Sequence, residues 1–489
     1  MSRFQPTNQS VLLQEMTMTQ APVWNAAPID TLLECQRQAF AATPYPSLKQ
    51  RQEALARLKE GLLTEGKRLE EALAQDYGQR SAFDTRISDL LPCVLQINYT
   101  RRRLRRWMAP SRRHAGLLLA PASVRVHYQP LGVVGIMVPW NFPVMLSIGP
   151  LITALAAGNR AIIKLSEFTP ATNAVLRQLL AERFDEDEVA VVEGGPEVAA
   201  QFSALPFDHL IFTGSTAVGR KVMAAASQHL TPLTLELGGK SPCLIAPDMP
   251  LDLAVERIIY GKCLNAGQIC VAPDYLLLPR GQEEALAEAF RRAFLRRYPK
   301  GLGSPDYTSL INQTHFQRLS AWLEEAKAAG AEVASVAEPG MDPEQHRMVP
   351  HLLWNLPERC TLLEQEIFGP LLPIIPYDTL DEALDYIRAR PRPLACYLMS
   401  LDEALTRRVV EEVHAGGMAI NETVFHVAAD DAPFGGIGPS GMGHYHGHEG
   451  FLTFSKAKTV LRRGRLSTGG LVHPPYGWLQ RLMLRFFMR

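Results

Sequence analysis

Short apolar segments alternate with helical segments through most of this chain, and this alternation limits the fold more than any other feature. The stretch HLIFTGSTAVGRKVMAAAS (209–227) has the pattern of a strand, a turn with glycine and serine, and a helix. Strand-like stretches also stand at 124–140, 157–166 and 190–195. Units of this kind build parallel sheets covered by helices on both faces, so the sequence predicts an α/β fold.

The same alternation continues after LELGGKSP (235–242). Strands are expected at 243–246, 274–278, 371–376, 394–400 and 417–420. Helices are expected at 251–264, 283–298, 314–329, 380–389 and 402–414. This pattern predicts a second α/β domain of similar size, and a chain of 489 residues with 47% hydrophobic residues is long enough for two or three cores.

The N-terminal part has a different character. Residues 1–30 are polar and aperiodic, and an N-terminal arm is expected over 1–44. Ser47 is a candidate N-cap, and leucines at helical spacing predict an amphipathic helix over 48–75.

Charge and cysteine content exclude several classes. Lys+Arg and Asp+Glu both number 50, so nothing draws the whole chain to nucleic acid. Seven irregularly spaced cysteines without a C-x-x-C pair disfavour a disulfide framework and suit the cytoplasm. No signal peptide or bilayer-spanning stretch is evident.

Two basic stretches each have two interpretations. RRRLRRWMAPSRRH (101–114) fits a phosphate-binding patch or a solvated helix face, and the neutral chain favours the helix face. YGWLQRLMLRFFMR (476–489) fits a helix on a membrane surface or a helix docked on protein, and docking is favoured.

Two motifs suit a dinucleotide. FTGSTAVG (212–219) places Gly214 and Gly219 between a strand and a helix, whose N-terminus suits a pyrophosphate, although a plain turn has the same pattern. IIKLSE ends a strand with Lys164 and Glu167, which either form a surface ion pair or hold an adenosine ribose. A carboxylate at Glu167 would repel a 2′-phosphate and favour NAD.

Three motifs suit catalysis. In VPWNFP, two prolines stiffen a loop that carries Asn141, a candidate oxyanion donor. In LELGGK, Glu236 precedes a glycine pair and is a candidate general base, or a salt-bridged strand end. In LNAGQICVAPD, Cys270 is a buried apolar filler, half of a disulfide, a metal ligand or a nucleophile on residue type alone.

Taken together and in this order, PWNFP, FTGSTAVG, LELGGKSP, GQIC and EIFGP (366–370) resemble the NAD(P)-dependent aldehyde dehydrogenase superfamily. The likeness covers about 45–475. The segment PFGGIGPSGMGHYHGHEGFLTFSKAK (433–458) resembles the class 3-like branch. NAGQICVAPDYLLLP and PPYGWL are similar to the coniferyl aldehyde dehydrogenases within that branch.

The resemblance implies roles for the motif residues. Cys270 would be the nucleophile, Glu236 the general base, and Asn141 an oxyanion donor with the Cys270 backbone N–H. The cofactor would be NAD, with NADP possible. Its contacts would come from residues of four motifs: Trp140, Lys164, Glu167, Gly214, Ser215, Gly219, Glu366 and Phe368.

The resemblance also implies an architecture. A Rossmann-type NAD domain with a five-stranded parallel sheet is expected over 45–235, and a catalytic domain over 236–425. Residues 426–489 would supply a C-terminal loop, an oligomerisation strand and a tail. A small β element from 115–130 and about 455–470 would join subunits into a homodimer or homotetramer.

Two stretches imitate other sites. HYHGH (444–448) alternates histidines as a metal-binding strand would, but no carboxylate or cysteine completes the set, so no metal is expected. FGGIGPSGMG (434–443) has the glycines of a nucleotide loop without a strand–helix unit around it, and a loop over the active site is expected instead.

The expected reaction is oxidation of a small-molecule aldehyde to its carboxylic acid, with coniferyl aldehyde as the preferred substrate. Medium- or long-chain aliphatic aldehydes and benzaldehyde-type compounds are the alternative. An acylating enzyme that uses coenzyme A is disfavoured because Glu236 is present. A catalytically silent homologue is disfavoured because Cys270, Glu236 and Asn141 are all present, and a cysteine hydrolase leaves the cofactor motifs unexplained.

Overall fold

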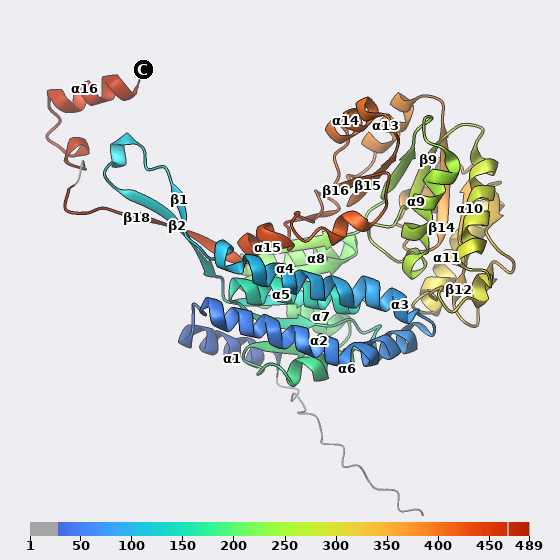
Figure 1. The fold of residues 1–489 in the computed structure, drawn as a ribbon, viewed down its shortest axis with the longest axis horizontal. Helices are drawn as coiled ribbons and strands as arrows, with labels where there is room; N and C mark the ends of the chain where they lie inside the picture. Colours follow the sequence, from blue (N-terminus) through green and yellow to red (C-terminus); the bar gives the residue numbers. More distant parts are fainter. Residues whose placement is uncertain (1–27, 467–468, 489) are drawn as a thin grey trace, which may run out of the picture.

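The computed structural model describes residues 28–466 and 469–488 of the chain. It consists of two α/β halves, each with its own sheet, and a three-stranded sheet that projects from them (Figure 1). The predicted α/β class is confirmed.

The first half is built around a six-stranded sheet with the order β17-β7-β6-β3-β4-β5. Its strands are β3 (Val133–Met137), β4 (Arg160–Lys164), β5 (Val189–Val192), β6 (His209–Gly214), β7 (Leu233–Leu237) and β17 (Gly441–Met442). β17 runs antiparallel to β7, and the other five strands are parallel. Successive strands extend in opposite directions from β3, so a crevice opens between β3 and β6 at the carboxyl ends of the strands, where such sheets bind ligands.

Helices cover both faces of this sheet. One face carries α2 (Leu48–Tyr77), α4 (Leu91–Trp107), α5 (Pro143–Ala157) and α6 (Pro170–Ala181). The other carries α1 (Ile29–Ala42), α7 (Pro196–Ser203) and α8 (Thr216–Ala226). Because both faces are covered, strands such as β3 are apolar and buried throughout.

The N-terminal region departs from the expected arm. Residues 29–42 form α1, which buries Leu32 and Leu33 against the sheet. The Gln36 amide also donates to the Ala161 carbonyl oxygen at 3.0 Å, which fixes α1 beside β4. The expectation of an arm to residue 44 therefore fails over this helix, and residues 1–27 lie outside the described part. The predicted Ser47 cap is present, because Ser47 and Gln50 form a capping box at the start of α2.

The second half has a seven-stranded sheet with the order β10-β13-β14-β9-β8-β15-β16. Its strands are β8 (Pro242–Ile245), β9 (Tyr275–Pro279), β10 (Glu332–Ser335), β13 (His351–Trp354), β14 (Leu371–Tyr377), β15 (Ala395–Met399) and β16 (Gly417–Ile420). One face carries α9 (Leu251–Cys263), α10 (Glu283–Arg297) and α11 (Gln313–Ala328), and the other α13 (Leu380–Arg388) and α14 (Glu403–Glu412). The expected elements are all present, and β10 and β13 extend the sheet beyond them.

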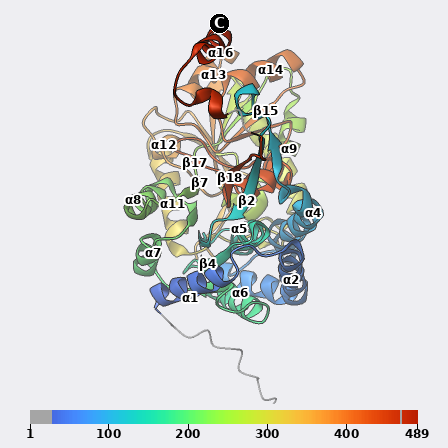
Figure 2. The same cartoon turned by 90° about the vertical axis from the view of Figure 1, so that its left-hand side faces the viewer.

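The third sheet joins β1 (Ser111–Arg113), β2 (Ser123–Pro130) and β18 (Ser455–Arg462). β18 pairs antiparallel with β2 along its whole length, and residues 456–462 are largely solvent-exposed. Beyond it, α16 (Trp478–Phe487) lies at the opposite end of the molecule from α1 and α6 (Figure 2), with no buried residue between its bounds. Within the described residues, no helix is both long and apolar enough to cross a bilayer.

Candidate active site

A cavity of about 240 Å³ gathers most of the predicted site residues. It lies at the carboxyl ends of the strands of the first half, against the loops that precede β9 and β14. Eight of the eleven predicted residues line it: Trp140, Asn141, Gly214, Ser215, Glu236, Cys270, Glu366 and Phe368. Segments that are far apart in sequence thus meet at the crevice between β3 and β6.

The turn that carries Asn141 is anchored from beneath. Asp89 accepts hydrogen bonds from the backbone N–H groups of Val144 and Met145, at 3.2 and 3.1 Å, in the first turn of α5. Arg80 forms a fully buried ion pair with Asp89 at 2.6 Å and donates to the Asn141 carbonyl oxygen at 2.9 Å. The prolines of PWNFP predicted a stiff loop, but this buried pair was not foreseen.

The Asn141 side chain is tied to the cysteine loop. Its amide donates to the Gln268 carbonyl oxygen at 3.1 Å, and the Asn265 amide donates to the Asn141 carbonyl oxygen at 3.0 Å. The Gln268 side chain in turn donates to Ser309 O and accepts from Ile311 N, at 3.1 and 3.0 Å. One amide hydrogen of Asn141 therefore positions it, and the second is available to a ligand in the cavity.

The loop before Cys270 has an unusual backbone. Asn265, Ala266 and Gly267 have φ values of 50°, 52° and 74° in succession. Asparagine and glycine tolerate this left-handed region, whereas alanine is strained there. Strain of this kind persists only where surrounding contacts over-determine it, and the Asn265 and Gln268 hydrogen bonds do so here.

Glu236 and Cys270 are both held in apolar surroundings. Glu236 lies in β7 with 4% of its surface exposed, and neither carboxylate oxygen has a hydrogen-bond partner among the described residues. Burial raises the pKa of Glu236 well above its usual value. Burial also raises the pKa of the Cys270 thiol to about 12, with further increases from Glu366 and Glu236. Without a ligand, burial therefore favours the neutral form of both groups.

Glu366 and Phe368 are positioned by a lysine that follows the glycine pair. Lys240 forms an ion pair with Asp274 and donates to the Gln365 carbonyl oxygen at 2.9 Å, while Asp274 accepts from Ile367 N at 2.9 Å. Burial raises the pKa of Glu366 to about 8. Phe368 has a φ of 50° and meets the Trp140 ring edge-to-face at 5.3 Å.

Three predicted residues do not line the cavity. Lys164 ends β4, and its ammonium lies 3.6 Å from the Glu167 carboxylate, so both stand at the carboxyl edge of the same sheet. Gly219 corrects an expectation. Its N–H already donates to the Ser215 carbonyl oxygen at 2.9 Å, and a Cβ there would approach Leu237 to 2.6 Å. This glycine allows α8 to pack closely on β7 and does not face a pyrophosphate.

The first turn of α8 is nevertheless a suitable anion site. Ser215 is its N-cap and accepts from Val218 N at 3.4 Å, and the N-terminus of an eleven-residue helix carries partial positive charge. Gly214 stands beside it, where a Cβ would meet the Phe212 ring at 2.5 Å. These residues, with the unpartnered Glu366 Oε1, fit a dinucleotide that enters the cavity from the crevice.

Two ionisable residues that line the cavity were missed in the sequence. His315 and Arg318 project from α11 into the same cavity. Burial lowers the pKa of His315 to about 4, and its Nδ1 has no partner among the described groups. Arg318 donates to the Ile367 carbonyl oxygen at 2.8 Å. Their i, i+3 spacing shows that they share a helix face, but nothing in the sequence shows that this face meets the crevice.

The structure shows what HYHGH (444–448) and FGGIGPSGMG (434–443) form. Among the described residues, no group of three histidine, cysteine, aspartate or glutamate side chains could hold a metal ion. HYHGH forms a loop and the start of α15 (Gly447–Thr453), not a strand. The glycine-rich segment supplies β17, where Gly441 pairs with Glu236, so the expected loop over the site runs directly beside the candidate base.

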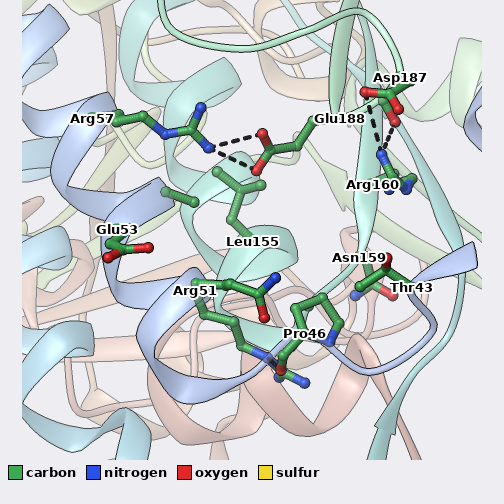
Figure 3. A pocket seen from close by; sticks show the side chains of 13 residues that line it. Thr43, Pro46, Arg51, Glu53, Arg57, Leu155, Asn159, Arg160, Asp187 and Glu188 are labelled. Atoms are coloured by element: carbon green, nitrogen blue, oxygen red, sulfur yellow. Dashed lines mark hydrogen bonds and ion pairs between the residues drawn. The ribbon is translucent and has the colours of Figure 1, made fainter. Parts of the chain in front are cut away.

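A larger cavity, of about 610 Å³, lies elsewhere in the first half (Figure 3). Four of its six charged side chains pair with each other: Arg57 with Glu188 at 2.8 Å, and Arg160 with Asp187 at 3.6 Å. It holds none of the predicted catalytic residues. Size alone therefore does not identify the site, and the convergence of motif residues does.

Comparison with known proteins agrees with this geometry. The aldehyde dehydrogenase family model matches residues 4–460. A relative from Pseudomonas aeruginosa named "Probable coniferyl aldehyde dehydrogenase" is 49% identical over 94% of this chain and 96% of its own. The substrate-bound structure of Staphylococcus aureus AldH has a TM-score of 0.90 at 36% identity, covering 94% of this chain and 100% of that one.

One similar solved structure contains a bound dinucleotide. A Mycobacterium tuberculosis aldehyde dehydrogenase solved with NAD⁺ has a TM-score of 0.80 at 28% identity, over 90% of this chain and 91% of that one. The fold, the motif residues in one cavity and these likenesses agree. This chain is an aldehyde-oxidising oxidoreductase that belongs to the NAD(P)-dependent aldehyde dehydrogenase family.

Proposed function

We propose that this protein oxidises coniferyl aldehyde to the corresponding acid through a covalent intermediate on Cys270. The observation that carries the mechanism is that Cys270, Asn141 and Glu236 line one cavity at the crevice between β3 and β6. The substrate follows from the name of the 49% identical relative and from the cysteine-loop and tail motifs.

The Cys270 thiol gives up its proton to solvent and its sulfur attacks the aldehyde carbon, and the Asn141 amide with the Cys270 backbone N–H stabilises the oxyanion of the thiohemiacetal. NAD(P), when bound, accepts the hydride that leaves this carbon, and a thioester on Cys270 remains. Glu236 then removes a proton from water, which hydrolyses the thioester and frees the carboxylic acid. The apolar surroundings of Glu236 suit a base that must keep a high proton affinity.

The cofactor would be held by residues on both sides of the crevice. The first turn of α8 would receive the pyrophosphate, Lys164 and Glu167 the adenosine ribose, and Glu366 the nicotinamide ribose. Trp140 and Phe368, which pack edge-to-face, would flank the ring. The Glu167 carboxylate is 37% exposed and would repel a 2′-phosphate, so we propose a preference for NAD.

We place the proposed domain boundaries at the ends of the two large sheets. Residues 29–237 would form the cofactor-binding domain except for β1 and β2, and 238–425 the catalytic domain. β18 is an edge strand of the projecting sheet, so we propose that it pairs with a second copy in a homodimer. Light scattering on the wild type and on Val460→Pro tests this, because proline removes an edge N–H, and a monomeric wild type would refute it. All seven cysteines are unpaired, which suits the cytoplasm.

A substrate panel tests the proposed function. Purified protein is assayed for NADH formation with coniferaldehyde, cinnamaldehyde, benzaldehyde, hexanal and decanal, each with NAD and NADP, and with Cys270→Ala as the blank. We expect the highest kcat/KM for coniferaldehyde with NAD and no turnover in the variant. Preference for hexanal or decanal would refute the substrate while keeping the mechanism, and turnover by Cys270→Ala would refute the nucleophile.

A further inference from the structure

The basic stretch 101–114 divides into two faces when it folds. Tyr99, Arg103 and Arg106 follow at i, i+4 and i+7 on α4, so they form one stripe along the helix. This stripe lines a cavity of about 380 Å³, whereas Arg105 lies outside it. A solvated helix face therefore accounts for only part of this stretch.

The cavity is separate from the site that contains Cys270. It lies between the C-terminal end of α4, the base of the projecting sheet and the start of α15, and it shares no lining residue with the catalytic cavity. Its volume falls within the range of small-molecule sites, about 300–1,000 Å³.

Flat aromatic side chains form much of its wall. Trp107 stacks on the His448 imidazole with ring centroids 5.9 Å apart, and Tyr99 packs on Trp107 at the same distance. The Arg103 guanidinium lies over the Tyr99 ring, 5.6 Å from its centroid. These rings form an aromatic wall in the cavity that Arg103 and Arg106 also line.

The charge in this cavity is unbalanced. Arg103 and Arg106 both line it, and neither forms an ion pair within 4.0 Å with a described carboxylate. The one carboxylate in the lining, Asp431, accepts a hydrogen bond from the Tyr99 hydroxyl. Two like charges on one helix face repel each other, and an oxyanion between them would remove that repulsion.

We propose that this cavity binds a small organic oxyanion, in which a carboxylate or phosphate group on a planar body contacts Arg103 and Arg106. Guanidinium groups match both oxyanions through paired N–H donors, and the aromatic wall accommodates the planar part. The proposal does not depend on which aldehyde is oxidised at Cys270.

Calorimetric titration tests the proposal. Benzoate, phenyl phosphate and inorganic phosphate are titrated into the full-length protein saturated with NAD, so that the dinucleotide crevice is filled. Benzoate and phenyl phosphate distinguish the two oxyanions, and inorganic phosphate lacks the planar body. We expect Arg103→Gln or Arg106→Gln to weaken binding about tenfold, the loss of one charge-assisted hydrogen bond, and Arg105→Gln to leave it unchanged.

Three results would overturn the proposal. The first is no binding of benzoate or phenyl phosphate by the wild type. The second is equal binding by all variants, which would place the anion elsewhere. The third is that inorganic phosphate binds as tightly as phenyl phosphate, which would show that the planar body of the ligand contributes nothing to binding. NADH formation by each variant is measured in parallel, and unchanged turnover shows that lost anion binding does not reflect misfolding.

Discussion

The two sides of the catalytic cavity differ in how completely their polar groups are bonded. On the cysteine side, Asn141, Asn265 and Gln268 donate to one another's carbonyl oxygens and to Ser309, and of these three side chains only Asn265 has a buried oxygen, Oδ1, without a partner among the described groups. On the opposite side, both Glu236 oxygens, Glu366 Oε1 and His315 Nδ1 have no partner among the described groups. The first arrangement fixes the position of a nucleophile. The second leaves buried acceptors that only a ligand or water can satisfy.

The unpartnered side is tested most directly by Glu236→Gln. A general base contributes about 10²–10⁴-fold to rate, so we expect steady-state turnover to fall by that factor. Hydride transfer precedes the step that needs the base, so rapid mixing should still show a burst of NADH. Unchanged turnover would exclude Glu236 as the base.

The same variant has a predicted effect on stability. Because folding raises the pKa of Glu236, the folded state binds a proton that the unfolded state releases above about pH 4.5. The free energy of unfolding of the wild type therefore falls as pH rises above that value. Glu236→Gln has no carboxyl at this position and does not show this fall. Thermal melts should show Glu236→Gln to be the more stable protein at pH 8, by a margin that shrinks towards pH 5. If the stability difference between the two proteins is the same at pH 5 and pH 8, burial does not raise the pKa of Glu236.

The bonded side is tested by Asn265→Ala, which removes two hydrogen bonds and places alanine at a φ of 50°. We expect about 2–4 kcal/mol lower unfolding free energy and a tenfold or greater fall in kcat. Asn355→Ala is the matched control, because Asn355 also has a left-handed φ, of 57°, but lies on an exposed turn. If both variants lose equal activity, backbone strain alone explains the effect.

The pH dependence of Cys270 ionisation tests how a bound cofactor changes the cysteine side of the cavity. With a thiol pKa of about 12, alkylation by iodoacetamide in the free protein should rise about tenfold per pH unit beyond pH 9. NAD carries a cationic ring, and a cation in the cavity lowers the pKa of an acid, so NAD should move the profile to lower pH, while NADH should not. The assay uses Cys35→Ser, which removes the one exposed thiol. If the pH dependence of alkylation is identical with and without NAD, bound NAD does not lower the pKa of Cys270.

The smallest effect is expected at the edge of the crevice. Glu167→Ala removes a carboxylate that would repel a 2′-phosphate, so the ratio of kcat/KM for NADP to that for NAD should rise severalfold. Glu193→Ala is the control, since Glu193 is a similarly exposed glutamate that follows β5 and pairs with Arg177 at 3.9 Å. If the ratio is unchanged, Glu167 does not contact the adenosine ribose.

Local patterns in the sequence predicted much of this structure. The alternation of strands and helices predicted four of the parallel strands in one half and the central strands of the other, the family resemblance added the fifth parallel strand, and the motifs gave eight residues of one cavity. The helix α1 was missed because Leu32 and Leu33 are its only buried apolar residues, too few to give a clear helical period. Arg80, Asp89, His315 and Arg318 were missed because their partners are distant in sequence, and no local period shows which distant segments meet. Gly219 was misassigned because a glycine in a loop motif suggests ligand approach, whereas here it serves packing.

The pairing of Gly441 with Glu236 carries a consequence for attempts to recombine such proteins. The cofactor-binding half is not a contiguous module, because its last strand comes from the far end of the polypeptide. A chimera that exchanged residues 29–237 alone would leave the edge of β7, and the candidate base upon it, against a foreign β17. Any transplant of this half should therefore carry residues 434–462 with it, so that the glycine-rich segment and the glutamate it flanks derive from one parent.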